Sequence, residues 1–383
     1  MQKKLIALAI LGLASSAAFA DVGMYGVLDG AVANLSGTGQ QSQMLAVSGG
    51  LAQSRLGVKA TEKLDGGLTA VAVVEYGMDG QSAAGFGTTP TARQQLLGLA
   101  GDFGTVATGY LQTTAFDFGA KFDPLADGAV SVLQSLTGAG GTNSGANNFL
   151  IGTNAIAAHA QRALAYISPS IGGVTIAVNY STALGPIGGA AGLSNAAALG
   201  NAGAASSAVN NNNTAYLASA AYDNGPLSVS LVYASASLTN VLNVPANTAT
   251  STEYAVGASY NFGVAKVNAT YQSNGQSVNS GATTTNTAYS VSAVAPVGPG
   301  AVALEYAANS IAAAGANSSS ALSGTGYSLA YLQGLSKTTT AYAAYSTVTN
   351  GSAATAFGVD NNIAPAGAGG STTLIALGLN KKF

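Results

Sequence analysis

The chain has 383 residues, only 7% of which are charged, and its formal net charge is −2. Soluble domains contain roughly 25% charged residues, so this composition argues against an ordinary soluble enzyme. The 12 basic and 14 acidic residues provide no positive field for nucleic acid, and the lack of cysteine excludes a disulfide framework or a thiolate metal site.

The N-terminal segment predicts export. Lys3 and Lys4 precede an apolar run from Leu5 to Leu13, and small residues follow as far as Ala20. This order is typical of a cleaved signal peptide. The alternative, an N-terminal membrane anchor, is disfavoured because the apolar run is too short to span a bilayer. We therefore expect residues 1–20 to be removed and residues 21–383 to form the folded unit.

Apolar and polar residues then alternate with a period of two. In residues 227–233, for example, Leu227, Val229, Leu231 and Tyr233 share one side. This alternation predicts strands with one apolar and one polar face. We count sixteen of them, beginning near residues 22, 52, 67, 92, 104, 161, 174, 214, 227, 253, 264, 286, 301, 325, 337 and 373.

Short and long connections alternate between these strands. Short ones, rich in Gly, Pro, Asp and Asn, are predicted as turns at residues 63–67, 101–104, 168–172, 223–226 and 296–300. Long ones, rich in Ala, Gly, Ser and Asn, include residues 182–213, 237–252, 309–324 and 348–372. Short periplasmic turns and long extracellular loops are typical of an outer-membrane barrel.

The last predicted strand, residues 373–383, places Ile375, Leu377, Leu379 and Phe383 on one face. A terminal aromatic residue closing such a strand resembles the assembly signal of outer-membrane barrels, which assigns that role to Phe383. The outward faces carry Ala, Val and Leu, with Tyr near the strand ends, and this suits lipid. A soluble sandwich would instead carry many exposed charges. The sequence therefore predicts an all-β, transmembrane antiparallel barrel in the bacterial outer membrane.

Particular residues resemble the general Gram-negative porin family of neisserial and burkholderial type. The opening strand reads Tyr25-Gly26-Val27-Leu28-Asp29-Gly30, and residues 54–75, 93–106 and 336–345 resemble further strands and turns of that family. The resemblance implies a homotrimeric channel in outer-membrane lipid, inserted by the barrel-assembly machinery, through which small hydrophilic solutes and ions diffuse passively. At residues 109–111 this chain has Gly-Tyr-Leu where the family commonly has Gly-Arg. Ion preference therefore does not transfer from the resemblance.

The resemblance also implies that the third long loop, residues 113–160, folds into the lumen and presents acids to arginines on the wall. The predicted constriction consists of the wall residues Arg55, Arg93 and Arg162 and the loop residues Asp117, Asp123 and Asp127. Secondary pore-lining candidates are Lys59, Glu75 and Lys121. An arginine stays hydrated in a wet lumen, whereas facing lipid at mid-depth it would cost ~2–4 kcal/mol.

These residues also have simpler interpretations. The arginines can snorkel to the membrane interface or pair with a loop carboxylate, and Asp123-Pro124 and Asp127-Gly128 are ordinary turn signals. The three aspartates are also a calcium-site alternative, although they lack the spacing of an EF-hand. The single histidine, His159, is expected to be a solvated loop residue.

Three other functions remain open at this point. They are a substrate-selective channel, an adhesin or structural barrel with a closed lumen, and an outer-membrane enzyme that uses His159. The chain has no nucleophile elbow, zinc-binding histidine motif or phosphate loop, so we expect no enzymatic activity and no cofactor.

Overall fold

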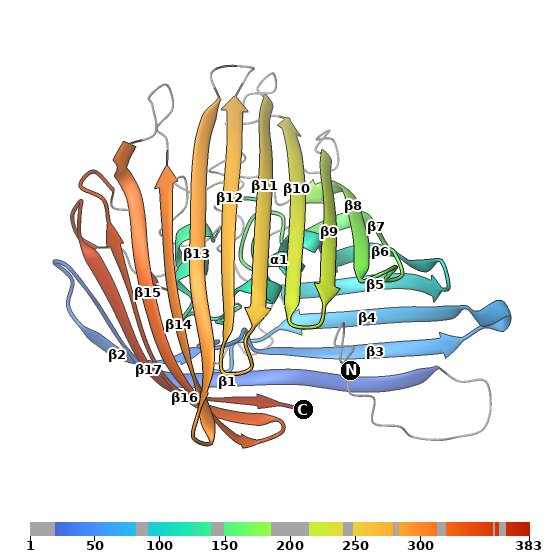
Figure 1. The fold of residues 1–383 in the computed structure, drawn as a ribbon, viewed down its shortest axis with the longest axis horizontal. Helices are drawn as coiled ribbons and strands as arrows, with labels where there is room; N and C mark the ends of the chain where they lie inside the picture. The colour runs from blue at the N-terminus through green and yellow to red at the C-terminus, as the bar shows by residue number, and fades with distance from the viewer. Residues whose placement is uncertain are drawn as a thin grey trace.

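The computed structural model describes residues 20–81, 91–125, 127–138, 149–184, 214–239, 248–278, 281, 283–311, 319–354, 357–359 and 365–383 (Figure 1). Its strands are β1 (Asp21–Gly37), β2 (Gln43–Ser48), β3 (Arg55–Lys63), β4 (Thr69–Gly77), β5 (Thr91–Gly101), β6 (Gly104–Gln112), β7 (His159–Ile167), β8 (Val174–Leu184), β9 (Thr214–Asn224), β10 (Leu227–Thr239), β11 (Thr248–Asn261), β12 (Lys266–Val278), β13 (Thr284–Val297), β14 (Gly300–Ile311), β15 (Ser319–Ser336), β16 (Thr339–Asn350) and β17 (Ser371–Lys382). A 3₁₀ turn, η1 (Asp65–Gly67), joins two strands, and one connection contains the helices α1 (Thr114–Phe122) and α2 (Val132–Thr137).

Antiparallel pairing closes the sheet on itself. From β3 onward each strand pairs with the next one along the chain, and β17 pairs with β1 from Val27↔Lys382 to Gly37↔Thr372. The other edge of β1 pairs first with β3 and then with β2, which are two parts of one interrupted strand. The described segments therefore occupy sixteen positions of a closed barrel, which confirms the predicted fold class.

Most predicted strand starts lie within a few residues of the observed ones. The second strand differs, because residues 49–54 interrupt it. Several strands also run further than predicted. Among them, β10 and β11 extend into the connection expected at residues 237–252, and β14 and β15 extend into the one expected at 309–324. Ser, Thr and Ala accept the extended conformation wherever a neighbouring strand supplies ladder hydrogen bonds, although they look like loop residues in the sequence.

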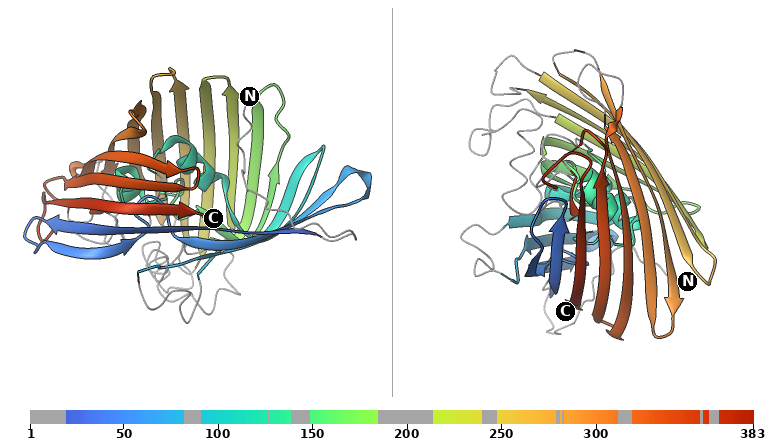
Figure 2. Two further views of the ribbon diagram at one scale, coloured as in Figure 1. Left: turned by 90° about the horizontal axis from the view of Figure 1, so that it is seen from below. Right: turned by 90° about the vertical axis from the view of Figure 1, so that its left-hand side faces the viewer.

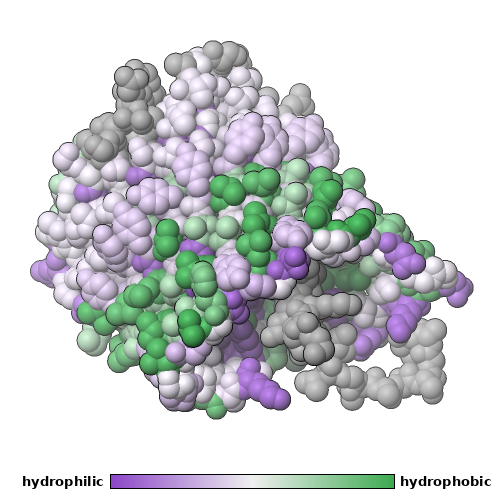
Figure 3. Space-filling model, viewed as in Figure 1, coloured by the Kyte–Doolittle hydropathy of each residue, from purple (hydrophilic) through white to green (hydrophobic). Residues whose placement is uncertain are grey.

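The outer face of the barrel is apolar. Its exposed side chains include Leu97, Leu231, Leu304 and Leu377, with 52–65% of their surface exposed. Figure 3 shows apolar side chains, in green, gathered in a band across the visible face. Leaving such side chains in contact with water is unfavourable, so the band indicates a surface that faces lipid.

Tyrosines on neighbouring strands form part of an aromatic girdle. Rings are in contact between Tyr180 and Tyr216, between Tyr233 and Tyr254, and between Tyr306 and Tyr327, with centroids 5.0–5.1 Å apart. Amphipathic rings of this kind are enriched where hydrocarbon meets the lipid headgroups.

Tight connections lie along one rim, between β3 and β4, β5 and β6, and each later pair as far as β15 and β16. All five predicted turns lie on this rim. Both views of Figure 2 place the two helices within the space that the strands enclose. None of the helices among the described residues is long and apolar enough to cross a membrane. The predicted signal peptide stays a prediction, because residues 1–19 lie outside the described residues.

Candidate functional site

The connection between β6 and β7 folds into the lumen, as predicted. Two side chains cap its helices: Thr113 accepts a hydrogen bond from the backbone N–H of Ala115, and Ser131 accepts one from that of Gln134. Caps of this type typically contribute about 1 kcal/mol each. Side chains of the loop itself therefore stabilise the first turn of each helix.

Helix α1 lies against β9, β10 and β11. Phe118 and Phe122 are buried against a patch of the wall that includes Leu217 and Val232. Gly257 on β11 permits this approach, because a Cβ there would clash with the ring of Phe122. The opposite side of the helix is more open, with Asp117 exposed. A polar helix face is thus left towards the lumen.

Helix α2 is held on β14 by a wall carboxylate. Glu305 accepts hydrogen bonds from the backbone N–H groups of Val132 and Leu133, at 3.0 and 3.4 Å. Asn309 donates to the carbonyl of Leu136 at 2.8 Å. The first N–H groups of a helix have no partner inside the helix, so Glu305 satisfies groups that would otherwise be buried unpaired.

A second wall carboxylate holds the end of the loop. Glu253 on β11 accepts hydrogen bonds from the backbone N–H of Leu150 and from the amides of Gln272 and Asn274. Gln272 also donates to the carbonyl of Ile151 at 2.7 Å. Each partner is buried, so removing one would leave polar groups unsatisfied.

The remaining contact is a charged cluster on β3, β4 and β5. Arg55 Nη1 lies 2.8 Å from Asp127 Oδ2, and Arg93 Nε lies 2.9 Å from Glu75 Oε1. Two longer pairs, Arg55–Glu75 at 3.9 Å and Arg93–Asp127 at 3.5 Å, complete the square. Tyr25 donates to Glu75 at 2.8 Å. The structure therefore brings together two predicted arginines, one predicted loop acid and the secondary candidate Glu75.

This cluster lies beside the interruption between β2 and β3. The loop forms backbone hydrogen bonds there, from Gln53 N–H to the Asp127 carbonyl and from Ala129 N–H to the Gly49 carbonyl. Gly128 is required for the close approach, because a Cβ would clash with the backbone of Gly50 and Leu51. The second strand is thus interrupted where the loop docks on it.

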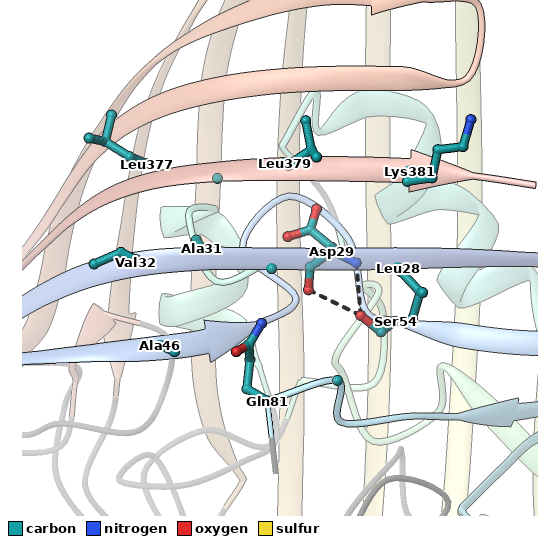
Figure 4. A pocket seen from close by; sticks show the side chains of 13 residues that line it. Leu28, Asp29, Ala31, Val32, Ala46, Ser54, Gln81, Leu377, Leu379 and Lys381 are labelled. Carbon is teal, nitrogen blue, oxygen red and sulfur yellow. Dashed lines mark hydrogen bonds between the residues drawn. The ribbon is translucent and has the colours of Figure 1, made fainter.

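Asp29 stabilises the interruption from β1. Figure 4 shows its backbone hydrogen-bonded to Ser54, with Leu28, Val32 and Leu377 lining a groove alongside. The Asp29 carboxylate accepts hydrogen bonds from Tyr342 and Asn380, both at 2.7 Å. It therefore ties the interruption to the strands that close the barrel.

Two other predicted loop acids lie elsewhere. Asp117 is exposed on α1 and accepts a 2.6 Å hydrogen bond from Gln112. Asp123 is buried inside the loop, where it accepts hydrogen bonds from Ser131 Oγ at 2.6 Å and Leu125 N–H at 2.8 Å. Burial raises the pKa of the Asp123 carboxyl to about 6, although these two hydrogen bonds oppose the shift.

The other basic candidates are separate from the cluster. Arg162 is exposed at a β-bulge, with φ of 48°, and forms no ion pair with the residues that the structure describes. Lys59 shares the face of β3 that carries Arg55. Lys121 pairs with Asp223 at 2.7 Å.

The expectation for His159 was wrong. It is the first residue of β7, only 1% exposed, and its ring packs against Tyr110 and Phe116 with centroids 5.9 and 5.3 Å away. Neither ring nitrogen has a hydrogen-bond partner among the described residues. The loop folds back over the start of β7 and covers this side chain, which its position in a long predicted loop did not indicate.

Glu253 and Glu305 were missed as functional residues by the sequence analysis. Each is a single carboxylate on the polar face of a strand, and the other residues on that face are mostly small. This isolated charge is the one feature of the sequence that could have indicated an anchoring role. Among the described residues, no group of three potential ligands is arranged to hold a metal ion.

A closed barrel with an apolar exterior and a lumen narrowed by an infolded loop defines a membrane channel. The profile of the family described as Gram-negative porin matches residues 7–353. The chain is 33% identical over 318 residues to outer membrane porin protein 32 of Delftia acidovorans, and the match covers 80% of each chain.

Among solved structures, the anion-selective porin from Comamonas acidovorans superposes with a TM-score of 0.74 at 25% identity, over 95% of this chain and 100% of that one. OmpT of Vibrio cholerae, solved in a trimer form, superposes with a TM-score of 0.64 at 16% identity, over 95% and 100% of the two chains. The chain belongs to the Gram-negative porin family. It is an outer-membrane channel for the passive diffusion of small hydrophilic solutes.

Proposed function

We propose that Arg55 gives this channel a weak preference for anions at its constriction. The observation that carries the proposal is unequal access to water within the charged cluster. The side chain of Arg55 is 24% exposed, whereas those of Glu75 and Asp127 are 5% and 9% exposed. Arg93, at 2%, is buried as well. Although the cluster is formally neutral, the charge it presents to water is positive.

The other members of the cluster position Arg55. Glu75 and Arg93 pair with each other in the wall, and Asp127 brings the loop to Arg55. A guanidinium is always ionised, so its field persists across neutral pH. Asp117 on the open side of α1 is the opposing wet charge, which keeps the preference weak. The relative from Comamonas acidovorans described as anion-selective is consistent with this proposal.

Salt-gradient recordings test the role of Arg55. Two unit charges about 4 Å apart in water interact by ~1 kcal/mol, which corresponds to roughly fivefold in a permeability ratio. We therefore expect R55Q to shift the reversal potential in a potassium chloride gradient towards cations, by up to this factor.

Lys381 provides the control, because it is exposed on the outward face of β17 and K381Q removes an equal charge. If R55Q and K381Q give the same reversal potential as the unmodified channel, Arg55 does not set ion preference.

We further infer a homotrimer embedded in outer-membrane lipid and inserted by the barrel-assembly machinery, with no enzymatic activity or cofactor. Phe383 supports the assembly role, because its backbone pairs with Gly26 of β1 at 3.0 and 3.1 Å while its side chain stays 50% exposed. Its ring is thus available to another protein during closure. We expect F383A to reduce the amount of folded protein in outer membranes. Unchanged amounts, measured by unheated gel mobility, would exclude the assembly role.

A further inference from the structure

A second charged cluster lies in the lumen, away from the constriction, at the rim of short turns. It consists of Lys121 on α1, Asp223 near the end of β9 and Lys266 at the start of β12. The two carboxylate oxygens of Asp223 accept hydrogen bonds from Lys121 Nζ at 2.7 and 2.9 Å. The backbone of Lys266 pairs with Asn261 of β11 near the same rim, where β9 ends and β12 begins.

The strand faces place all three groups inside the barrel. Asp223 is on the same face of β9 as Ser219, which contacts Thr114 of α1. Lys266 is on the same face of β12 as Gln272, which hydrogen-bonds the loop. Because short turns mark the periplasmic rim, the cluster lies between the loop and the periplasm.

Lys121 is held firmly in place. Its neighbour Phe122 is fully buried against the wall, and Thr114 fixes the other end of α1 to β8 through the Asn179 side chain at 3.0 Å. Ser228 donates to Asp223 at 2.5 Å and fixes the carboxylate. A charged group on an anchored helix loses less conformational freedom on binding than one on a mobile chain.

Some N–H donors of the two ammonium groups in this cluster are available to a ligand. An ammonium group has three N–H donors, and Lys121 uses two contacts on Asp223. Lys266 is exposed and has no hydrogen-bond or ion-pair partner among the described residues. Two ammonium groups against one carboxylate leave a net positive charge in a water-filled vestibule.

We propose that Lys121 and Lys266 form a binding site for small oxyanions at the periplasmic side of the loop. The proposal rests on the channel function and deepens the anion preference, since an anion that passes Arg55 would pause here before it leaves. The ligand class is defined by its chemistry: a phosphate or carboxylate group that accepts hydrogen bonds from both ammonium groups.

Chloride current with added inorganic phosphate tests the site. Phosphate that dwells between the lysines should reduce the single-channel chloride current in a saturable way. We expect K266Q to weaken this inhibition roughly fivefold, as for the loss of one close charge contact. K266R, which keeps the charge, should retain it.

Asp223 supplies the opposite test. D223N frees Lys121 and should strengthen inhibition by phosphate, whereas the outward-facing control K381Q should leave it unchanged. The site is disproved if the unmodified channel shows no saturable inhibition, if K266Q matches K381Q, or if D223N weakens inhibition. If K266Q does not fold, the signs for D223N and K266R still decide. The two proposals can be distinguished. If any of these results disproves the lysine site while R55Q still shifts the reversal potential, the oxyanion site is wrong and the proposed role of Arg55 is unaffected.

Discussion

Asp123 shows how a single residue can control the loop. Its carboxyl is buried among loop atoms, next to the Ser131 cap of α2, and Glu305 of the wall lies within electrostatic range. Charge is disfavoured there, and the pKa of Asp123 rises from its usual 3.8 to about 6. At neutral pH the native loop therefore contains an ionised group at a cost in stability.

This shift predicts a pH dependence with a definite sign. The native state binds the Asp123 proton more tightly than the unfolded state does, so its contribution to stability is greatest below pH 4 and is lost as the pH rises towards 6. A shift of two units corresponds to at most about 3 kcal/mol. An amide at this position does not titrate: its oxygen can still accept from Leu125 N–H, and its NH2 group can donate to Ser131 Oγ in place of the bond it accepted.

We therefore expect the thermal unfolding temperature of the unmodified protein in detergent to fall between pH 4 and pH 7 relative to that of D123N. The control D102N changes an exposed turn residue and should behave as the unmodified protein does. Parallel pH profiles for the unmodified protein and D123N would exclude this role for Asp123.

At the residue level, strand parity indicated which side chains face the lumen wherever the strand pairing is regular. Arg55 and Glu75 lie on the inward face that the period-two pattern of β3 and β4 gives them. Arg93 lies at a bulge between Ala92 and Gln94, opposite Glu75 and Tyr76, so family position alone indicated its inward direction. Arg162 could not be placed in this way, because the bulge opposite Gly109 depends on the partner strand. The anchoring role of Glu253 and Glu305 was not predicted from the sequence either, because their partners are loop N–H groups more than 100 residues away along the chain.

At the scale of elements, the loop is a clamp that spans the lumen. Its helices pack on different parts of the wall, α1 on β9–β11 and α2 chiefly on β14 and β15. Its middle, at residues 127–130, joins the interruption between β2 and β3. The size of the channel is therefore set by contacts distributed around the barrel, and the tightest backbone approach is at Gly128.

A methyl group at Gly128 should loosen this clamp. It would clash with the backbone of Gly50 and Leu51, neither of which can rotate away. Overpacking of this kind costs about 1–3 kcal/mol, enough to populate an undocked loop. We expect G128A to increase single-channel conductance and current noise. G334A is the matched control, because a Cβ there meets no atom within 4 Å. Equal conductance in G128A and G334A would contradict the clamp.

The elements themselves were largely predictable because period-two patterning and turn residues act locally. Strand ends in the segments rich in Ser, Thr and Asn were not, since those residues become extended only when a neighbour pairs with them. The interruption at residues 49–54 was not predicted either, because it lies where the infolded loop, distant along the chain, docks on the wall. The infolded loop itself was inferred from family resemblance, and its own residues showed only turn signals and phenylalanines.

On the scale of the whole molecule, the outside and the inside of the barrel follow opposite rules. Outward positions of β1 and β17 such as Val32 and Leu377 are apolar, whereas the inward Asp29 forms hydrogen bonds across the seam to Asn380 and Tyr342. Closure gives each described strand except β2 a hydrogen-bonded partner on both edges, and a bilayer requires such pairing. The polar interior is then free to hold water, and the loop makes the opening narrow enough for a few charges to influence passage.

Single-channel recording of the purified protein without residues 1–20 in planar bilayers, under a potassium chloride gradient, tests whether the closed barrel is an anion-preferring channel. We expect discrete conductance steps and a reversal potential of the sign given by anion preference. A bilayer that shows no steps at any protein concentration, or a reversal potential of the cation sign, would contradict it.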